Sequence, residues 1–437
     1  MTTQLVLAST AFGLATVVAA KRAGLLRPAD RYVLVCSNNG AVPEVAGALL
    51  EVAGATELAG DFDAVLDLND ALAPLHPSAW TPRESELPVW HRYLRRHWGL
   101  TDPVDLLVES IQVDPALALC RVFADARVDV YADGLMSYGP TRVALPDAVG
   151  ARAERVLHLD LVPGLVPLLL REFDVDVQLV PTDAFTAVVG RPAPAPDRVA
   201  APGVALLLGQ YLSAGGVLSV TEEAGLHADM LRGAVAAGHR RLEFKPHPSA
   251  PVGQAAGLQA VAAELGVELA VRGGDELAEA RFARGGIALV VGCFSTALAT
   301  ARFYGLPTAT VGTDLLLERL TPYENSNRGP VTIVRATVRD LDVLAGCADH
   351  RPPPASEVDL TDLVGCVAYC MQPRRNPDLR ATAVRVLREH PDEVRPYVKR
   401  RRLTSLELPG GGGRRVLRPT LNRLLSRPPR PARPTRP

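Results

Sequence analysis

The sequence is poor in cysteine and in aromatic residues. Its six cysteines are scattered along 437 residues, and aromatic residues make up only 5% of the chain. Cys366 and Cys370 lie close together, but a single pair with that spacing makes neither a zinc site nor a disulfide framework. The sequence therefore indicates reduced thiols in a cytosolic protein, with a core built from alanine, valine, leucine and glycine.

The chain also lacks a hydrophobic run long enough to cross a membrane. The most apolar stretch, residues 5–20, is shorter than the roughly 20 residues that a transmembrane helix needs, and Ser9, Thr10 and Gly13 interrupt it. No basic segment precedes it, as one would in a secretion signal. We expect instead a strand, a turn at Ser9 and Thr10, and a helix that ends near Gly24, in a protein of the cytoplasm.

Acidic residues are nearly absent from the C-terminal end. From Lys399 onward there are twelve arginines and lysines and one acid, Glu407, so this end carries +11 and the rest of the chain −12 of the net charge of −1. Residues 409–437 are rich in glycine, proline and arginine, a composition that predicts disorder. Their arginines are suited to holding the chain on an anionic membrane surface at the inner face or on an anionic glycan, or they form a solvated extension without a function. No nucleic-acid partner is expected.

The sequence does have a repeated alternation of short strands and helices. The patterns predict strands over residues 5–8, 31–36, 64–66, 128–131, 155–159, 204–208, 241–244, 266–270, 287–291 and 308–311, and helices over 43–52, 87–98, 222–237, 257–265, 295–304 and 360–388. Such alternation is typical of parallel sheets with right-handed crossovers. With 48% apolar residues, a chain of this length can bury the cores of two such domains.

A Pro/Ala-rich stretch divides the alternation and is interpreted as a linker. We therefore expect an α/β protein of two doubly wound, Rossmann-like domains that face a cleft. The expected divisions are residues 1–190, the linker 191–203, a second domain over 204–375, a helical extension over 376–408 and the tail 409–437. Ligands of such sheets bind beyond the carboxyl ends of the strands, so the loops directly after strands are the candidate sites.

The first candidate loop is Lys245-Pro246-His247-Pro248, directly after a predicted strand. Each proline fixes its own φ angle and pushes the preceding residue into an extended conformation, so the backbone is stiff on both sides of His247. A histidine aimed into the cleft can donate to a phosphate or transfer a proton near neutral pH. The alternative is a rigid turn with an exposed histidine, but the position after a strand favours the functional interpretation.

A second candidate loop, residues 292–298, leads from a buried strand into a helix that begins near Ser295. Ser295 and Thr296 are good helix caps, which is the simple explanation of their presence. The start of a helix also presents free N–H groups and a partial positive charge, which suit a phosphate. The two hydroxyls would add donors, and we favour phosphate binding over capping alone.

The third candidate loop is Ala132-Asp133-Gly134, after the strand 128–131. The Asp133 carboxylate is suited to taking a proton from an incoming hydroxyl, and Gly134 permits a sharp turn. Asp-Gly is also the commonest turn signal, so the motif alone does not establish a site. Together, a base in one domain and a histidine with a phosphate cradle in the other can displace a nucleotide phosphate from a sugar by a hydroxyl.

These motifs resemble those of the bacterial alpha-2,8-polysialyltransferase and sialyltransferase family. That family has two acidic residues before a glycine, then His-Pro, then paired hydroxyls; here these are 132–134, 247–248 and 295–296, in the same order. Residues 209–211, 293–300 and 322–328 are also similar, and the resemblance extends over about residues 1–375. The chain departs from the family at Ala132, where the first acid is missing, so the base is assigned to Asp133.

The resemblance implies a GT-B fold and inverting transfer of sialic acid, or a related nonulosonic acid, from a CMP-sugar to a glycan hydroxyl. Asp133 would be the base, His247 would stabilise or protonate the leaving phosphate, and Ser295 and Thr296 would bind that phosphate. No metal and no cofactor are expected, because the histidine and the helix N–H groups do the work of a metal.

The resemblance also divides the roles between the domains. Residues 1–190 would bind the glycan or glycolipid acceptor and residues 204–375 the nucleotide sugar, in the synthesis of a cell-surface or capsule polysaccharide. The further residues implied at the donor are Gly209, Gln210, Lys245 and Pro248.

Two other functions remain open from the sequence. A glycerophosphotransferase that uses CDP-glycerol would have a similar His-Pro context and would cradle a diphosphate. A non-catalytic capsule-assembly or glycan-binding relative is the second alternative, and Ala132 is the residue that favours it.

Overall fold

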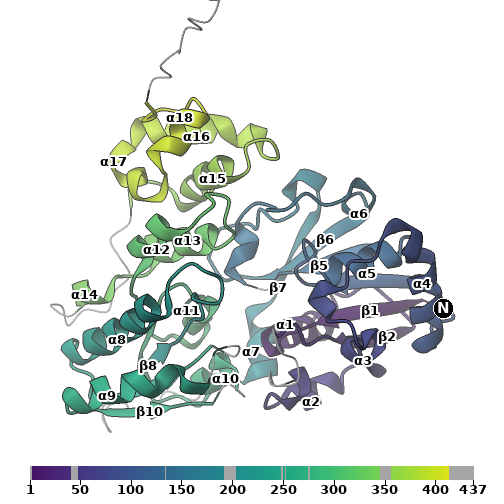
Figure 1. Cartoon of the computed structure of the whole chain (residues 1–437), viewed down its shortest axis with the longest axis horizontal. Coiled ribbons are helices and arrows are strands. Elements are labelled where there is room, and N and C mark those ends of the chain that lie inside the picture. The colour runs from purple at the N-terminus through teal and green to yellow at the C-terminus, as the bar shows by residue number, and fades with distance from the viewer. Residues whose placement is uncertain are drawn as a thin grey trace, which may run out of the picture.

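The computed structural model describes residues 2–40, 48–132, 134–190, 203–247, 250, 252–273, 276–344 and 356–412. Nearly all of the expected linker and most of the basic tail therefore lie outside the described residues, as do Asp133 and Pro248. Figure 1 shows the first domain in purple to blue beside the second in teal to green, with a group of helices at the C-terminal end in yellow-green.

The first half of the chain builds a seven-stranded sheet. Its strands lie in the order β3-β2-β1-β4-β5-β6-β7, and all neighbours run parallel. The order reverses between β1 and β4, which is the point where a doubly wound sheet opens a crevice for a ligand. The strands are β1 (Thr3–Ala8), β2 (Arg31–Cys36), β3 (Ala64–Asp67), β4 (Val104–Val108), β5 (Val128–Tyr131), β6 (Ala153–Leu159) and β7 (Asp176–Val180).

Helices cover both faces of this sheet. Side chains alternate along β1, so that Val6 and Ala8 pack with α1 while Leu5 and Leu7 pack with α3, α4 and α5 on the other face. The hydrophobic residues of both faces are therefore buried, as expected for a parallel sheet. The helices are α1 (Ala11–Arg22), α2 (Ala55–Ala59), α3 (Leu68–Leu72), α4 (Leu87–His97), α5 (Ala116–Val122), α6 (Asp147–Gly150) and α7 (Thr182–Val189).

The second sheet has five parallel strands in the order β10-β9-β8-β11-β12. Its order reverses between β8 and β11, which gives a second crevice. The strands are β8 (Val204–Leu208), β9 (Arg241–Lys245), β10 (Glu268–Val271), β11 (Ile287–Gly292) and β12 (Thr308–Thr310). The helices are α8 (Val220–Ala236), α9 (Ala256–Glu264), α10 (Ala278–Ala283), α11 (Thr296–Thr300), α12 (Thr313–Arg319), α13 (Arg328–Thr337) and α14 (Leu341–Leu344).

The segment after the C-terminal helix α15 contacts the first domain. Gln372 donates to the carbonyl of Arg142 at 2.9 Å, and Arg375 donates to the carbonyl of Thr141 at 2.7 Å. These bonds tie the segment after α15 to the first domain. The helices are α15 (Leu360–Met371), α16 (Arg380–Glu389), α17 (Pro391–Val394) and α18 (Arg400–Ser405).

Two strands and three of the expected helices differ from the expectations. The helix expected over residues 360–388 is two helices, α15 and α16, separated by residues 372–379. The strands β4 and β7 were not expected. The helix expected over residues 43–52 is wrong where it is described, since 49–51 form a single 3₁₀ turn and residues 41–47 lie outside the described residues. The helix expected over residues 295–304 is α-helical only at 296–300 and then tightens into 3₁₀ geometry before Gly305, whose φ angle is +64°.

Two further observations on the described residues concern the cysteines and the apolar helices. The five described cysteines are free and buried. Among the described helices, none combines the length and the apolar character that a bilayer crossing requires.

One buried charge cluster anchors the start of β5. Asp129 is fully buried and accepts hydrogen bonds from Arg27 at 2.7 and 2.8 Å and from Arg155 at 2.5 Å. Both arginines would lose their main acceptor if this carboxylate were removed. The cluster therefore fixes the strand that leads to Ala132 and Gly134.

Asp129→Ala should lower the free energy of unfolding by about 3–5 kcal/mol, because removing one partner of a buried ion pair leaves the others uncompensated. Urea denaturation of the wild type and of Asp129→Ala would measure this difference in the free energy of unfolding. The exposed Asp147→Ala is the matched control and should change the free energy by no more than about 0.5 kcal/mol. Equal effects of the two substitutions would contradict the anchoring role of Asp129.

Candidate active site

A pocket of about 730 Å³ lies between the two domains, and its walls are largely loops that follow strands. The ends of β1 and β4 open onto it from the first domain, and the ends of β8 and β11 open onto it from the second, so both crevices face the same space. The first-domain wall consists of residues 9–12, 38–40, 49, 52, 109–110 and 135–136, and the second-domain wall of residues 208–212, 245–247, 276–279, 294–297, 327 and 330.

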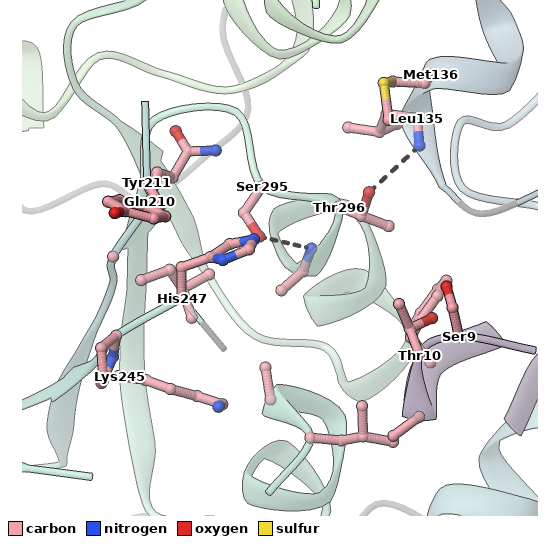
Figure 2. Close-up of a pocket in the computed structure, with 18 of the residues that line it drawn as sticks. Ser9, Thr10, Leu135, Met136, Gln210, Tyr211, Lys245, His247, Ser295 and Thr296 are labelled. Atoms are coloured by element: carbon pink, nitrogen blue, oxygen red, sulfur yellow. Dashed lines mark hydrogen bonds between the residues drawn. The ribbon is translucent and has the colours of Figure 1, made fainter. Parts of the chain in front are cut away.

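His247 stands at the edge of this pocket, two residues after the end of β9. Its imidazole is exposed to solvent, and Figure 2 shows it pointing into the part of the pocket where Ser295 lies. Partial desolvation, and secondly the nearby Lys245 ammonium, lower the pKa of His247, while Glu223 acts in the opposite direction. His247 is therefore mainly neutral at pH 7 before a ligand binds.

Lys245 and Glu279 lie together in the second-domain wall and are both buried. Thr300 donates a hydrogen bond to the Glu279 carboxylate at 2.5 Å. Burial raises the pKa of Glu279, and the Lys245 ammonium and the Thr300 hydrogen bond partly offset that rise. The predicted donor residue Lys245 thus lines the pocket, with part of its charge balanced by an acid that the sequence did not single out.

Ser295 and Thr296 stand side by side at the start of α11, and both line the pocket. Ser295 caps the helix, since its Oγ accepts the N–H of Ala297 at 3.2 Å. Thr296 Oγ1 accepts the N–H of Leu135, in the first domain, at 3.3 Å. Each hydroxyl keeps its own proton for donation, so capping and phosphate binding are compatible.

The Thr296 contact brings the loop after β5 against the second domain. Gly134 has a φ angle of +132°, which L side chains rarely adopt, and a Cβ there would lie 2.4 Å from Thr296 Oγ1. A glycine is therefore required on two counts, conformation and space. Of the expected motif 132–134, Asp133 lies outside the described residues. Ala132 is buried and extends the strand pairing, donating to the carbonyl of Leu157 at 2.8 Å.

The loop after β8 is held by two buried polar residues of α8 that sequence reasoning missed. Glu223 accepts the N–H of Leu212 at 2.6 Å and both the N–H and the hydroxyl of Ser213, at 3.1 and 2.6 Å. His227 Nε2 accepts the N–H of Gln210 at 3.2 Å, which places its proton on Nδ1. Their spacing of four on the buried side of a predicted helix was the available signal.

The same loop also packs against the loop that carries His247. The N–H of Gly209 donates to the carbonyl of Lys245 at 2.8 Å. A Cβ at Gly209 would lie 2.7 Å from the ring of Phe244 and 3.1 Å from the Cα of Pro246. This backbone bond joins the loop of the predicted donor residues Gly209 and Gln210 to the loop of Lys245 and His247.

Glu109 is a further pocket residue that the sequence did not reveal. It directly follows β4, the strand that was not expected, and its side chain is buried at 4% exposure. Oε1 accepts the N–H of Ser9 at 2.6 Å. Recognising β4 would have placed this carboxylate at the carboxyl edge of the first sheet.

In the described part of the chain, the group with a geometry suited to a metal ion is Glu357, His390 and Glu393. None of the three lines the pocket. They belong to the C-terminal helical region. His390 Nδ1 lies 3.5 Å from a carboxylate oxygen of Glu393, and the other oxygen of Glu393 accepts a hydrogen bond from a neighbouring serine.

Comparison with known families identifies the chain. A sequence model of the alpha-2,8-polysialyltransferase (POLYST) family matches residues 4–313, more than half of the chain. The chain belongs to this family. The matched region includes all the pocket loops up to β12, and the two parallel-sheet domains facing one pocket form a GT-B fold. This polysialyltransferase-family protein is therefore a glycosyltransferase of sialic acid. None of the curated protein sequences matches it.

Several solved structures are similar at low identity. The glycosyltransferase of Rickettsia africae is 12% identical, with 91% of this chain and 98% of that chain covered and a TM-score of 0.41. The GT-B domain of the sialyltransferase of Photobacterium damselae is 11% identical, with 76% and 96% covered and a TM-score of 0.39. The putative UDP-N-acetylglucosamine 2-epimerase of Listeria monocytogenes is 11% identical, with 70% and 78% covered and a TM-score of 0.42.

Gly134→Ala should disrupt the contact between the domains and lower the transferase rate by at least tenfold. The substitution combines a strained backbone conformation, at about 1–3 kcal/mol, with a clash against Thr296. Steady-state transfer and thermal unfolding would be measured together.

The control is Gly24→Ala, where φ is +73° and no atom lies within 4 Å of the added Cβ. It should show the cost of an alanine at a positive φ angle without a clash, and leave transfer unchanged. If both variants had the same transfer rate and thermal stability, the close approach of Gly134 to Thr296 would not contribute to activity.

Proposed function

We propose that this protein transfers sialic acid, or a related nonulosonic acid, from a CMP-sugar to a hydroxyl of a glycan, with inversion at the anomeric carbon. The main support is that His247, Ser295 and Thr296 line one wall of a single pocket. Leu135, two residues after Asp133, lines the facing wall. The proposed donor groups and the proposed base loop thus border the same space.

The second-domain wall is proposed to bind the CMP-sugar. Ser295 and Thr296 would donate their hydroxyl protons to the phosphate, and the imidazole of His247 would donate from the neighbouring loop. Gly209, Gln210 and Lys245 would lie along the nucleotide, with Pro248 stiffening the turn after His247. The hydrogen bonds that Glu223 and His227 accept from the loop after β8 support this assignment, because they hold that loop in place before a ligand arrives.

The proposed reaction is one displacement. The acceptor oxygen forms a bond to the anomeric carbon while the bond from that carbon to the phosphate oxygen breaks, and CMP leaves with the bonding electrons. Asp133 takes the proton of the acceptor hydroxyl, and His247 stabilises or protonates the phosphate oxygen that departs. Attack from the side opposite to the leaving group inverts the configuration.

The family membership supports the finer parts of the proposal. We infer an acceptor that already ends in alpha-2,8-linked sialic acid, repeated transfer, and a cell-surface or capsule glycan as the product made in the cytoplasm. Attachment to the inner face of the membrane stays a prediction from the arginine-rich tail, which is outside the described residues beyond 412.

Calorimetric binding of CMP, with UMP and ADP as controls, tests the donor class. We expect selective binding of CMP, weakened about tenfold in His247→Ala, because a hydrogen bond to a charged group contributes about 1.5–3 kcal/mol. Binding that shows no preference for CMP would contradict the CMP-sugar donor. A further comparison with CDP-glycerol would separate the glycerophosphotransferase alternative.

CMP affinity should also fall as the pH rises. An anionic phosphate favours the protonated imidazole, so binding raises the lowered pKa of His247 and takes up a proton. The affinity conferred by the charged imidazole is then present at low pH and is lost as the pH rises through the higher pKa of the complex.

The dissociation constant would be measured at pH values from about 5.5 to 8.5 in wild type and His247→Asn. The phosphate of CMP itself titrates near pH 6, so the difference in slope between the two proteins isolates the imidazole. Parallel slopes would show that His247 does not change its charge when CMP binds.

A further inference from the structure

The first-domain wall of the pocket holds a carboxylate with no assigned role. Among the described residues of that wall, Glu109 is the acidic one, and none of them is basic. It follows β4, next to β1, at the point where the strand order reverses. Ligands of doubly wound sheets bind at this crevice, so the position of Glu109 is that of a ligand-binding residue.

The Glu109 side chain is held in a defined place. Its Oε1 accepts the N–H of Ser9 at 2.6 Å. Gly13, in the first turn of α1, leaves the space for Oε2, because a Cβ there would lie 2.9 Å from that oxygen. Ser110 turns the backbone sharply with a φ angle of +45°. A buried carboxylate that is held in place and lines the pocket can orient a bound group.

The surroundings of Glu109 suit the hydroxyl end of a sugar. The uncharged polar residues Ser9, Thr10, Asn38 and Asn39 share the wall with it, and Figure 2 shows Ser9 and Thr10 across the pocket from His247. An ionised carboxylate accepts hydrogen bonds and repels another anion. This wall should therefore receive hydroxyl groups and turn the carboxylate of a sialic acid away.

We propose that Glu109 binds the acceptor: it accepts hydrogen bonds from the hydroxyls at the growing end of the glycan and orients the attacking oxygen toward the donor wall. The role rests on the proposed function, since it concerns the acceptor half of the same pocket. It is distinct from proton abstraction, which is assigned to Asp133.

The test compares wild type with Glu109→Gln. Glutamine keeps an oxygen for the Ser9 N–H but loses the charge, so the fold should be retained, and thermal unfolding would verify this. The KM for an alpha-2,8-linked sialic acid oligomer should rise about tenfold, as expected for losing a charged hydrogen bond, with kcat reduced less than fivefold. Hydrolysis of the CMP-sugar without acceptor, and the affinity for CMP, should be unchanged.

Two further variants sharpen the comparison. Glu109→Asp keeps the charge on a shorter side chain and should recover part of the acceptor affinity. Glu84→Gln removes an exposed charge of the same domain outside the pocket and should match wild type. Direct calorimetric binding of the oligomer without donor provides a readout that does not depend on transfer.

An unchanged oligomer affinity and KM in Glu109→Gln would overturn the proposal. So would a loss of kcat beyond a hundredfold at constant KM, together with loss of the acidic limb of the pH profile, since Glu109 would then be the base. Failure of the wild type to bind the oligomer would also overturn it. These outcomes are separate from the donor test, because a protein that binds the oligomer but not CMP would contradict the proposed donor and leave the role of Glu109 intact.

Discussion

The close approach of Gly134 to Thr296 is the constraint on which the pocket depends. The Thr296 hydroxyl accepts the N–H of Leu135, so one residue of the second domain touches both the proposed phosphate site and the loop of the proposed base. Only a glycine fits at 134, because its φ angle and its distance from Thr296 both exclude a side chain. The loop of the proposed base and the proposed phosphate site are thus held together by a direct contact between the domains.

The second-domain wall, where the donor is proposed to bind, is held in place by other contacts. Its loops contain glycine and proline, yet buried groups on α8 satisfy their backbone: Glu223 accepts three hydrogen bonds from residues 212–213, and His227 accepts one from Gln210. Because these acceptors are buried, releasing the loop would leave a carboxylate and an imidazole without partners, which is costly. A ligand therefore meets loops that are already in place, and less of its binding energy is lost in ordering them.

The sequence allowed the two parallel-sheet domains and three of the pocket loops to be predicted, because strand ends are marked by local signals such as Lys-Pro-His-Pro. It could not reveal features whose partners are distant in the chain. The strand β4 was missed because Asp105 interrupts its apolar run, and that charge is balanced by Arg127, which is 22 residues away. Leu135 and Thr296 are 161 residues apart, so the need for glycine at 134 appears only in the folded chain.

The missed strand bears on the one departure from the family pattern. Ala132 replaces the first of two acids, but β4 and β5 are neighbours in register, with Val108 opposite Val130. That pairing sets Glu109 beside the strand that ends at Tyr131, so the first domain still presents a carboxylate to the pocket. A sheet edge collects side chains from adjacent strands, and loss of an acid from one strand end does not by itself remove negative charge from the site. The alanine is therefore weaker evidence for an inactive relative than the motif alone suggests.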